Sequence, residues 1–487
     1  RYIQKMRTPP KIKKSAPKVD HGRVHFIGIG GIGMSSLSRW FLAQNWLVTG
    51  SDAVKGPITQ ELTKDGIKVK IGHNKGNLPK NTDLVVHTAA MPADNPEFLA
   101  AKEAGIKTVK YSEALGELTK KYKTIAIAGS HGKSSTTAMV ATILIKAKMD
   151  PTVIIGTKIN GWNFRAGKSE YLVIEADEYK GAFWNYYPYA AIVTNIDLEH
   201  VDFYKNLTAV KNSFVKFLNH IPKNGYMVLN GDNENISSII PRLKKGSIIT
   251  FGDDDKKTID MIKKIIKVPG RHNIMNALAA FKLSKALGIE EEIILKALSS
   301  YKGVWRRIEY KGNTPEGYKV FDDYGHHPTE IKATLQAIYE KFPKKNIVCV
   351  FQPHQQKRLV ALYKDFTTSF ADADYILIPN VYNPKGRDEL SHNINSESLA
   401  KDINKSLSTP SSVITTTTSV IPATSVITTT TSVIPAKAGI QNFPRAKYIG
   451  SLKNIPKEIK KLPLKKGDII VMMGAGDIAE ITPSLLK

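Results

Sequence analysis

Residues 124–135 read TIAIAGSHGKSS, a short apolar run followed by a turn of glycine, lysine and hydroxyl residues. The apolar part predicts a buried strand, and the stretch that continues to Ala147 predicts a helix directly after the turn. Backbone N–H groups of such a turn bind phosphate at the positive end of the helix. Lys133 and Ser134 stand where a phosphate-binding loop contacts the β/γ-phosphates and Mg²⁺. An ordinary P-loop kinase or GTPase is disfavoured, because Ile127 stands where the first Walker glycine would fall.

A second glycine-rich turn lies upstream, where the strand-like residues 24–27 run into Gly28-Ile-Gly-Gly-Ile-Gly33 and a helix-like stretch follows to Ala43. The glycines let backbone N–H groups approach a diphosphate. Asp52 ends the next predicted strand, 19 residues after Gly33, where a carboxylate binds a ribose hydroxyl in dinucleotide-binding folds. From these residues alone the turn predicts a nicotinamide dinucleotide site, with a ligand-free strand-helix turn as the alternative.

The pattern of short apolar runs and helical stretches predicts an α/β protein with three domains. Further strands are expected at 67–71, 83–87, 171–175, 190–195, 319–322, 346–351, 375–379 and 468–473, and helices at 271–287 and 396–407. The predicted divisions are a flexible basic arm at 1–20, a Rossmann-like domain at 21–119, a P-loop ATPase-like domain at 120–304 and a Rossmann-like domain at 305–487.

Composition excludes several classes of protein. The 487 residues are 42% hydrophobic and 23% charged, which is typical of globular domains rather than disordered or disulfide-scaffold chains. The net charge of +26 comes mostly from dispersed lysines, so we interpret it as solvated surface and expect no nucleic-acid partner. The single cysteine, Cys349, lies in an apolar run and predicts a buried residue in a reducing compartment. No apolar run has the length of a signal peptide core or a membrane helix, so we expect a cytoplasmic protein without membrane insertion.

A tandem repeat interrupts the third predicted domain. The segment SVITTTTSVIPA occurs at residues 412–423 and again at 425–436. Two copies cannot build a stacked core. We therefore expect a surface insertion at about 408–441, since such insertions cost little loop-closure entropy.

Acidic residues follow the predicted strands of the central domain. Glu175-Ala-Asp-Glu178 ends one strand, and Thr194-Asn-Ile-Asp197-Leu-Glu-His200 ends the next. A carboxylate at this edge of the sheet, near the phosphate loop, would hold Mg²⁺. His200 is either a second ligand or a loop histidine without that role.

Nine motifs in this order resemble those of the Mur ligases. The resemblance spans residues 22–487 apart from the repeat. Its motifs are Gly28-Ile-Gly-Gly-Ile-Gly-Met34, Gly129-Ser-His-Gly-Lys-Ser134, Glu175-Ala-Asp-Glu178, Thr194-Asn-Ile-Asp197, Gly270-Arg-His-Asn-Ile-Met-Asn276, Arg306-Arg307, Asp322-Asp-Tyr-Gly-His-His-Pro328, Phe351-Gln-Pro-His354 and Gly474-Ala-Gly-Asp-Ile478.

The resemblance implies a three-domain enzyme that uses ATP and Mg²⁺. Its motifs are most similar to the members that join L-alanine to the lactyl carboxylate of UDP-N-acetylmuramate in peptidoglycan biosynthesis. The first domain would then bind the UDP-sugar rather than a nicotinamide cofactor. ATP would phosphorylate the carboxylate, and the alanine amine would displace phosphate from the acyl phosphate. The partners would be these small molecules, with the chain a monomer or a homodimer.

The resemblance also implies roles for individual residues. The catalytic set would be Lys133, His200, Arg306, Arg307 and His327. The ATP-binding set would be Gly129, Ser130, His131, Gly132, Lys133, Ser134, Ser135, His272, Asn273, Asn276 and Asp322. The UDP-sugar set would be Gly28, Gly30, Gly31, Gly33, Met34, Asp52 and Thr88. The amino-acid set would be Tyr324, His326, His354 and Arg358, and the metal ligands Ser134, Glu175 and His200.

Two of these groups have other interpretations. Without the resemblance, His272 and Asn273 would be a helix N-terminal cap. The pair His326-His327 suggests a zinc site, but cysteine or glutamate in metal-ligand spacing does not accompany it.

The chain departs from the family pattern at four places. Ser130, Ser134 and Ser135 stand where threonines are usual, which keeps the hydroxyls. Tyr179-Lys180 replaces a Ser-Asp pair, Glu199 replaces an aspartate, and Gln355 replaces an arginine. The last change leaves Arg358 or Lys357 to hold the amino-acid carboxylate alone, and a charge-assisted hydrogen bond is worth roughly 1.5–3 kcal/mol.

Three other functions are alternatives to alanine ligation. A murein tripeptide ligase of peptidoglycan recycling shares most of the motifs, but Phe351-Gln-Pro-His354 favours the alanine-adding enzyme. An NAD-dependent dehydrogenase leaves the second phosphate loop unexplained. An inactive sugar-nucleotide-binding protein is disfavoured by Lys133, Glu175, His200 and Arg306.

Overall fold

The computed structural model describes residues 22–200, 203–244, 246–383, 393–408 and 444–487. The chain forms two compact units, residues 1–309 and 310–487, which are described separately. The arm expected at 1–20 and the repeat at 412–436 lie outside the described residues.

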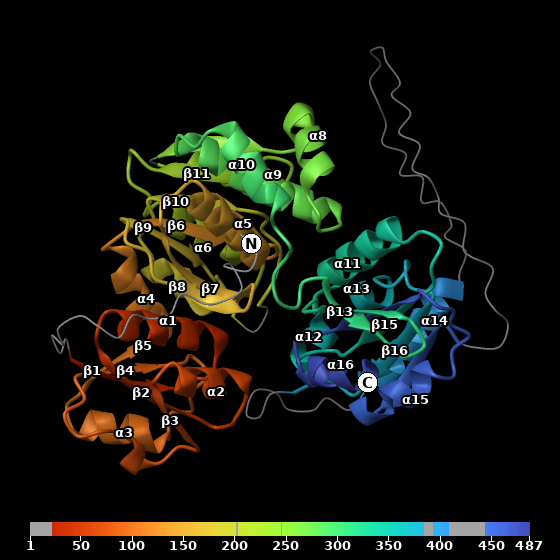
Figure 1. The fold of residues 1–487 in the computed structure, drawn as a ribbon, viewed down its shortest axis with the longest axis horizontal. Coiled ribbons are helices and arrows are strands. Elements are labelled where there is room, and N and C mark those ends of the chain that lie inside the picture. The colour runs from red at the N-terminus through yellow and green to blue at the C-terminus, as the bar shows by residue number, and fades with distance from the viewer. Residues whose placement is uncertain (1–21, 201–202, 245, 384–392, 409–443) are drawn as a thin grey trace, which may run out of the picture. The chain divides into compact units, whose positions relative to one another are not determined.

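The first unit begins with a five-stranded parallel sheet in the order β3-β2-β1-β4-β5 (Figure 1). The order reverses between β1 and β4, and in open α/β sheets ligands bind at the carboxyl ends of the strands beside such a reversal. The strands are β1 (Arg23–Ile27), β2 (Leu47–Asp52), β3 (Lys68–Ile71), β4 (Leu84–His87) and β5 (Lys107–Lys110). The helices are α1 (Ile32–Ala43), α2 (Pro57–Lys64), α3 (Pro96–Glu103) and α4 (Tyr111–Thr119), with a 3₁₀ turn η2 at Lys75–Asn77.

A seven-stranded sheet follows in the order β12-β11-β10-β6-β9-β7-β8, parallel except for β8, which runs antiparallel to β7. The central strand β6 is buried on both faces beyond its first residue, which explains its continuous apolar sequence. The strands are β6 (Lys123–Ala128), β7 (Thr152–Ile159), β8 (Trp162–Arg165), β9 (Tyr171–Glu175), β10 (Ala190–Val193), β11 (Tyr226–Asn230) and β12 (Ser247–Phe251).

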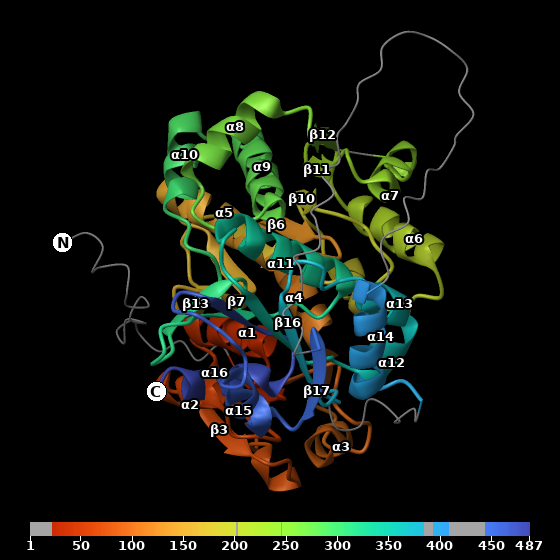
Figure 2. The same cartoon turned by 90° about the vertical axis from the view of Figure 1, so that its right-hand side faces the viewer.

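Helices cover this sheet, and α5, α9 and α10 pack together beside it (Figure 2). Their small and aliphatic side chains, such as Ala138, Ala141 and Ala277, permit this close packing. The helices are α5 (Lys133–Lys146), α6 (Leu207–Leu218), α7 (Glu234–Ser237), α8 (Lys256–Ile265), α9 (Arg271–Ala286) and α10 (Glu291–Ser299), with 3₁₀ turns η3 (Tyr179–Asn185) and η4 (Ile240–Arg242).

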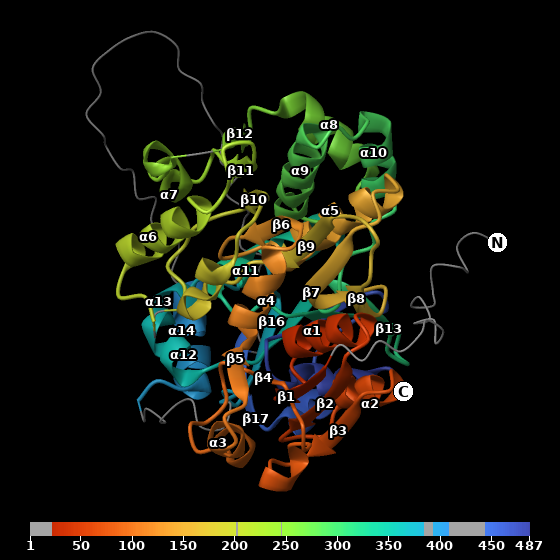
Figure 3. The ribbon, with the colours of Figure 1, turned by 90° about the vertical axis from the view of Figure 1, so that its left-hand side faces the viewer.

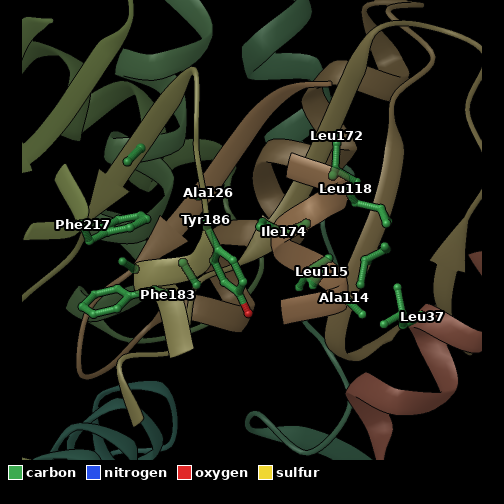
Figure 4. Close-up of a cluster of buried hydrophobic side chains, with 14 of the residues drawn as sticks. Leu37, Ala114, Leu115, Leu118, Ala126, Leu172, Ile174, Phe183, Tyr186 and Phe217 are labelled. Atoms are coloured by element: carbon green, nitrogen blue, oxygen red, sulfur yellow. The ribbon is translucent and has the colours of Figure 1, made fainter. Parts of the chain in front are cut away.

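The two sheets of the first unit are joined through α1, which lies beside the hairpin β7–β8 (Figure 3). Asn163 in the hairpin is 2% exposed. Its side-chain amide donates to the Ile32 carbonyl and to Ser35 Oγ, both at 2.9 Å, and its carbonyl accepts from Ser36 Oγ at 2.6 Å. One apolar cluster also continues from Leu37 in α1 to Phe217 in α6 (Figure 4). The helix that follows the first glycine-rich turn is therefore fixed to the second sheet.

The second unit contains a six-stranded sheet in the order β13-β14-β18-β15-β16-β17. Cys349 lies in its strand β15 and is fully buried, as the sequence predicted. The strands are β13 (Glu309–Asn313), β14 (Lys319–Asp323), β15 (Ile347–Phe351), β16 (Tyr375–Pro379), β17 (Ala446–Gly450) and β18 (Ile469–Met473). The helices are α11 (Pro328–Lys341), α12 (Gln356–Ala361), α13 (Tyr363–Thr367), α14 (Ser396–Ser408), α15 (Ile455–Ile459) and α16 (Thr482–Leu485), with 3₁₀ turns η5 (Leu452–Asn454) and η6 (Asp477–Glu480).

The three sheets confirm the predicted α/β class. The hairpin β7–β8 and the strands β5, β11, β12, β13 and β17 were not predicted from the sequence. Edge strands such as β12 are largely exposed and therefore lack the apolar run that marks a central strand. Across the described ranges, every helix is too short or too polar to cross a bilayer.

Candidate functional site

The loop between β6 and α5 needs its glycines. Gly129 has a φ of +131° and Gly132 a φ of +85°, which side chains rarely adopt. A Cβ on Gly129 would lie 2.1 Å from Thr194 Oγ1, and one on Gly132 would lie 2.6 Å from Asn276 Oδ1. The loop is also held by Asn195, whose Oδ1 accepts from the His131 N–H at 2.8 Å. The backbone conformation at the start of α5 is thus fixed by neighbouring segments.

Lys133 is paired with an acidic side chain at the edge of the sheet. Its ammonium lies 3.0 Å from Glu178 Oε2 and donates to the Gly129 carbonyl at 2.7 Å. Burial lowers the pKa of Lys133, but Glu178, Asp177 and Glu199 outweigh it and raise that pKa. Burial raises the pKa of Glu178, but Lys133 and His200 bring it down to about 2. Both groups are therefore charged at neutral pH.

The acidic side chains at the ends of β9 and β10, called the acidic edge below, form two groupings. Ser134 Oγ donates to Glu175 Oε2 at 3.0 Å, and the Gly156 N–H donates to the other oxygen at 2.8 Å. Burial raises the pKa of Glu175, although these hydrogen bonds and the charge of Lys133 oppose it.

The second grouping contains the one set of three or more candidate metal-ligating side chains in the described residues, Asp177, Glu178 and His200. Their ligand atoms lie within 4.8 Å of one another. His200 Nε2 is 3.6 Å from Glu178 Oε1 and 3.9 Å from both Asp177 Oδ1 and Glu199 Oε2. Carboxylate and imidazole ligands suit a divalent cation. Asp177 and Glu178 were not in the predicted ligand set, although the quoted Glu-Ala-Asp-Glu motif contains them.

Two of the sequence departures lie at this edge. The Tyr179 ring is 4.8 Å from the His200 ring, and the Lys180 ammonium lies 5.3 Å from the Tyr179 ring. Lys180 has a φ of +52°. Tyr179 therefore packs against the histidine of the metal-ligating group.

Residues expected near the adenine lie at the start of α9. Asn276 contacts Gly132 of the phosphate loop, as described above. Asn273 Nδ2 donates to the Pro269 carbonyl at 2.7 Å and lies 3.1 Å from His272 Nε2. Asn273 thus holds the turn before the helix through the Pro269 carbonyl. The N-cap position is Gly270 and receives no side-chain hydrogen bond, so the capping role that the sequence allows without a ligand is not observed.

The arginine pair lies at the end of the first unit. Arg306 is 7% exposed, has a φ of +56° and donates its N–H to Glu309 Oε2 at 3.0 Å. Arg307 lowers the pKa of Glu175 through its charge. Arg307 therefore lies within electrostatic range of the Ser134–Glu175 grouping.

The first glycine-rich turn lies at the carboxyl end of β1 in the five-stranded sheet, beside the reversal of strand order. A Cβ on Gly28 would meet the Thr88 side chain at 2.7 Å, so β1 and β4 approach closely there. The Gly30 N–H donates to Asp52 Oδ2 at 2.8 Å. Gly31 precedes the first residue of α1, and a Cβ on Gly33 would lie 3.0 Å from the Tyr111 hydroxyl. The remaining UDP-sugar residue, Met34, is 4% exposed and packs in the apolar cluster.

The second unit brings the predicted amino-acid residues together. The His326 ring centroid is 5.5 Å from that of Tyr324 and 6.0 Å from that of His354. Arg358 Nη1 lies 3.4 Å from His354 Nδ1. Burial lowers the pKa of His326 well below its usual value, so the ring is neutral. The sequence did not predict Tyr382, whose ring stacks on His354 at 5.5 Å.

The other predicted residues of this unit have structural contacts. Asp322 is 3% exposed and accepts from Thr482 Oγ1 at 2.5 Å. His327 caps α11, since its Nδ1 accepts from the Thr329 N–H at 3.3 Å. Gln355, which stands where an arginine was expected, has a φ of +69° and donates its N–H to the Tyr382 carbonyl at 2.9 Å.

Three family models match successive parts of the chain. They describe the Mur ligase family, catalytic domain, at residues 23–123, the Mur ligase middle domain at 127–284, and the Mur ligase, glutamate ligase domain, at 306–476. Each match falls mainly on one of the three sheets.

Curated relatives and solved structures agree with these matches. A UDP-N-acetylmuramate–L-alanine ligase of Clostridium botulinum is 42% identical over 390 residues, which are 75% of this chain and 84% of the relative. One from Clostridium acetobutylicum is 36% identical over 489 residues and covers 96% and 97% of the two chains. The crystal structure of a UDP-N-acetylmuramate–alanine ligase from Thermotoga maritima has a TM-score of 0.74 at 26% identity, covering 96% of this chain and 98% of its own. A murein peptide ligase from Psychrobacter arcticus shares the fold, with a TM-score of 0.65 at 23% identity over 95% and 98% of the two chains. The chain therefore belongs to the Mur ligase family.

Proposed function

We propose that this chain catalyses the ATP-dependent ligation of L-alanine to the lactyl carboxylate of UDP-N-acetylmuramate. The relatives that carry this activity in their names match nearly the whole chain, including all three sheets. The observation that carries the chemistry is the glycine loop at Gly129–Gly132, with the Lys133 ammonium beside it and a buried acidic edge opposite. Such an arrangement is suited to holding a nucleoside triphosphate.

The reaction has two steps. The lactyl carboxylate oxygen attacks the γ-phosphorus of ATP, ADP leaves, and an acyl phosphate forms. The alanine amine then attacks the acyl carbon, phosphate leaves with the bonding electron pair, and an amide results after loss of a proton. Both steps demand mainly positioning and charge compensation.

Lys133 supplies charge compensation in this proposal. Its ammonium is held within reach of the loop carbonyls and stays protonated beside Glu178. Binding of an anionic phosphate would let the ammonium exchange part of its contact with Glu178 for a phosphoryl oxygen. Arg307, within electrostatic range of Glu175, would add a second positive charge.

The donor set at the acidic edge fits Mg²⁺. Ser134 and Glu175 offer a hydroxyl and a carboxylate, and Asp177, Glu178 and His200 offer a second group. A bound Mg²⁺ would neutralise phosphate charge during transfer. The buried carboxylates then have a function that offsets the desolvation of their charges.

The amino-acid pocket is proposed in the second unit. Tyr324, His326 and His354 form its aromatic part, and Arg358 is its cation. Because Gln355 is uncharged, Arg358 would bind the alanine carboxylate without a neighbouring arginine. We also propose a cytoplasmic location, where ATP and UDP-sugars are made.

Phosphate release tests the proposal. UDP-N-acetylmuramate, ATP and Mg²⁺ are supplied with alanine, glycine, serine or the recycled tripeptide, one at a time. Release with alanine supports the assignment and shows that Gln355 is compatible with it. Preference for the tripeptide would move the function to recycling, and no release with any amine, despite measured UDP-sugar binding, would leave an inactive binding protein.

A further inference from the structure

Tyr179 contacts the second grouping of the acidic edge, although no step of the proposed reaction uses it. The Tyr179 ring centroid lies 4.8 Å from that of His200, and the two ring planes are inclined by 43°. The Tyr179 N–H donates to Asp177 Oδ1 at 3.1 Å. Tyr179 therefore contacts two of the three candidate metal-ligating residues, His200 through its ring and Asp177 through its backbone.

The backbone of the grouping is held from another side, by Tyr204. The Tyr204 hydroxyl donates to the Glu178 carbonyl at 2.6 Å, and Tyr204 is 4% exposed. The His200 carbonyl accepts from the Phe203 and Tyr204 N–H groups at 2.8 and 2.9 Å. Tyr204 thus joins the backbones of Glu178 and His200, and neither contact involves the Tyr179 ring. A change to that ring would therefore act on the His200 side chain rather than on the backbone.

The direction of the His200 side chain depends on weaker contacts. His200 has a φ of +54°, a left-handed conformation that persists in a non-glycine residue only where the surroundings hold it. Its Nε2 lies 3.6 Å from Glu178 Oε1 and 3.9 Å from Asp177 Oδ1, beyond the roughly 2.7–3.2 Å of an ordinary hydrogen bond. The carboxylates attract the imidazole without fixing its orientation. The Tyr179 ring supplies a packing contact that restricts its rotation.

We propose that Tyr179 is a positioning residue, whose ring holds the His200 imidazole in place to bind a divalent cation beside Asp177 and Glu178. A side chain that is already held loses less conformational freedom when it binds a ligand, so the cation binds more tightly. The serine that the family pattern has at this position would not provide this contact. The inference rests on the proposed function only for the identity of the cation as Mg²⁺.

Mn²⁺ binding to the full chain, followed by the electron paramagnetic resonance of free Mn²⁺ without nucleotide, tests this. Mn²⁺ accepts carboxylate and imidazole ligands. The relevant Mn²⁺ is the part whose binding His200→Ala abolishes. Tyr179→Ser should weaken that binding by about 3- to 10-fold, because it removes the ring contact. Tyr179→Phe keeps the ring and should stay within about twofold of the wild type. Each variant keeps the backbone hydrogen bond to Asp177.

Tyr187→Ser is the matched control. Tyr187 lies two residues after η3, and its ring stacks on His220 at 4.7 Å, so the variant loses the same kind of contact. Neither Tyr187 nor His220 belongs to the grouping of candidate metal ligands in the described residues. The control should leave Mn²⁺ affinity unchanged. Melting temperatures of the metal-free variants show whether each one is folded.

A double-mutant cycle shows whether Tyr179 acts through His200. In the His200→Ala background, Tyr179→Ser should have no further effect on Mn²⁺ binding. The same weakening in both backgrounds would overturn the positioning role. So would an unchanged affinity in Tyr179→Ser, or an equal loss in Tyr179→Phe, which would assign the effect to the hydroxyl. Mn²⁺ binding that does not change in His200→Ala would show that no cation binds at this grouping, and would overturn the inference as well.

The outcomes separate this inference from the ligase function. If the wild type releases phosphate with alanine while Tyr179→Ser binds Mn²⁺ as the wild type does, the ligase function stands and the positioning role fails. Mn²⁺ binding that depends on Tyr179 and His200, in a chain that releases no phosphate, would support the positioning role without the ligase reaction.

Discussion

Replacing Glu97 by glutamine should lower the stability of the five-stranded sheet, and the hydrogen bonds to Glu97 indicate by how much. The carboxylate has no exposure and receives five hydrogen bonds, from the side chains of His25, Ser51, His73 and Asn77 and from the Asn74 N–H. Its pKa falls from 4.5 to about 2 in the folded chain. At about 1.4 kcal/mol per pH unit, this difference corresponds to about 3 kcal/mol of stabilisation at neutral pH. A glutamine side chain would also place its own N–H donors against some of the five groups that donate to Glu97. This mismatch adds to the loss of stability.

Hydrogen exchange measures the stability of this sheet locally, without assuming that the whole chain unfolds in one step. A loss of about 3 kcal/mol corresponds to roughly 100-fold faster exchange of the amides in β1 and β2. Glu113→Gln is the matched control, because Glu113 is exposed and accepts a backbone hydrogen bond from the Lys110 N–H at 2.8 Å. Exchange in the control should stay within about threefold of the wild type.

The pH dependence provides an independent check. A carboxylate with a lowered folded pKa contributes stability that is present above pH 4.5 and is lost as the pH falls from 4.5 towards 2. The difference in melting temperature between wild type and Glu97→Gln should therefore narrow from pH 7 to pH 3. Exchange rates in β1 that match the wild type at pH 7, or a difference that does not narrow, would refute the reasoning.

Three further changes have expected outcomes. Lys133→Ala should lower phosphate release by at least about 100-fold while UDP-sugar binding, measured by calorimetry, persists, because the two anions bind on different sheets; loss of both together contradicts this division. Gly129→Ala should abolish ATP binding or folding, because its Cβ would lie 2.1 Å from Thr194 Oγ1. Its control is Gly72→Ala, where the Cβ would meet no atom within 4 Å and the loss of stability in thermal melts should be only about 1 kcal/mol. Asn163→Ala should cost about 1–3 kcal/mol, seen as a lower melting temperature, because it leaves the part-buried Ile32 carbonyl without the Asn163 donor; an unchanged melting temperature would contradict that role.

The sequence predicted best what depends on short-range pattern. The fully buried strands β6 and β15 have continuous apolar sequences, and the two glycine-rich turns stand directly before helices. The fold class followed from this alternation. The hairpin β7–β8 did not, because its contacts with α1 join residues more than 100 positions apart and no local pattern records them.

The motifs predicted which residues belong to the candidate site, but not which of their side chains pair with each other. The sequence placed Glu175 and His200 near the phosphate loop, yet it could not show that Lys133 pairs with Glu178 rather than with Glu175. The acidic residues at these two strand ends all carry the same charge, so their spacing does not separate them; they are Glu175, Asp177, Glu178, Asp197 and Glu199. The contact between His73 and Glu97 was missed for a related reason, since it depends on the order of strands in the sheet.

The distribution of charge at the acidic edge supports the proposed position of the cation. Glu178 is already compensated by Lys133 and His200, which lower its pKa to about 2. Burial instead raises the pKa values of Glu175 and Glu199, so their nearby positive charges do not offset the desolvation. A divalent cation bound beside Ser134 would supply the missing positive charge at Glu175. It would do so without displacing Lys133 from Glu178, which leaves the lysine to exchange that contact for phosphate when ATP binds.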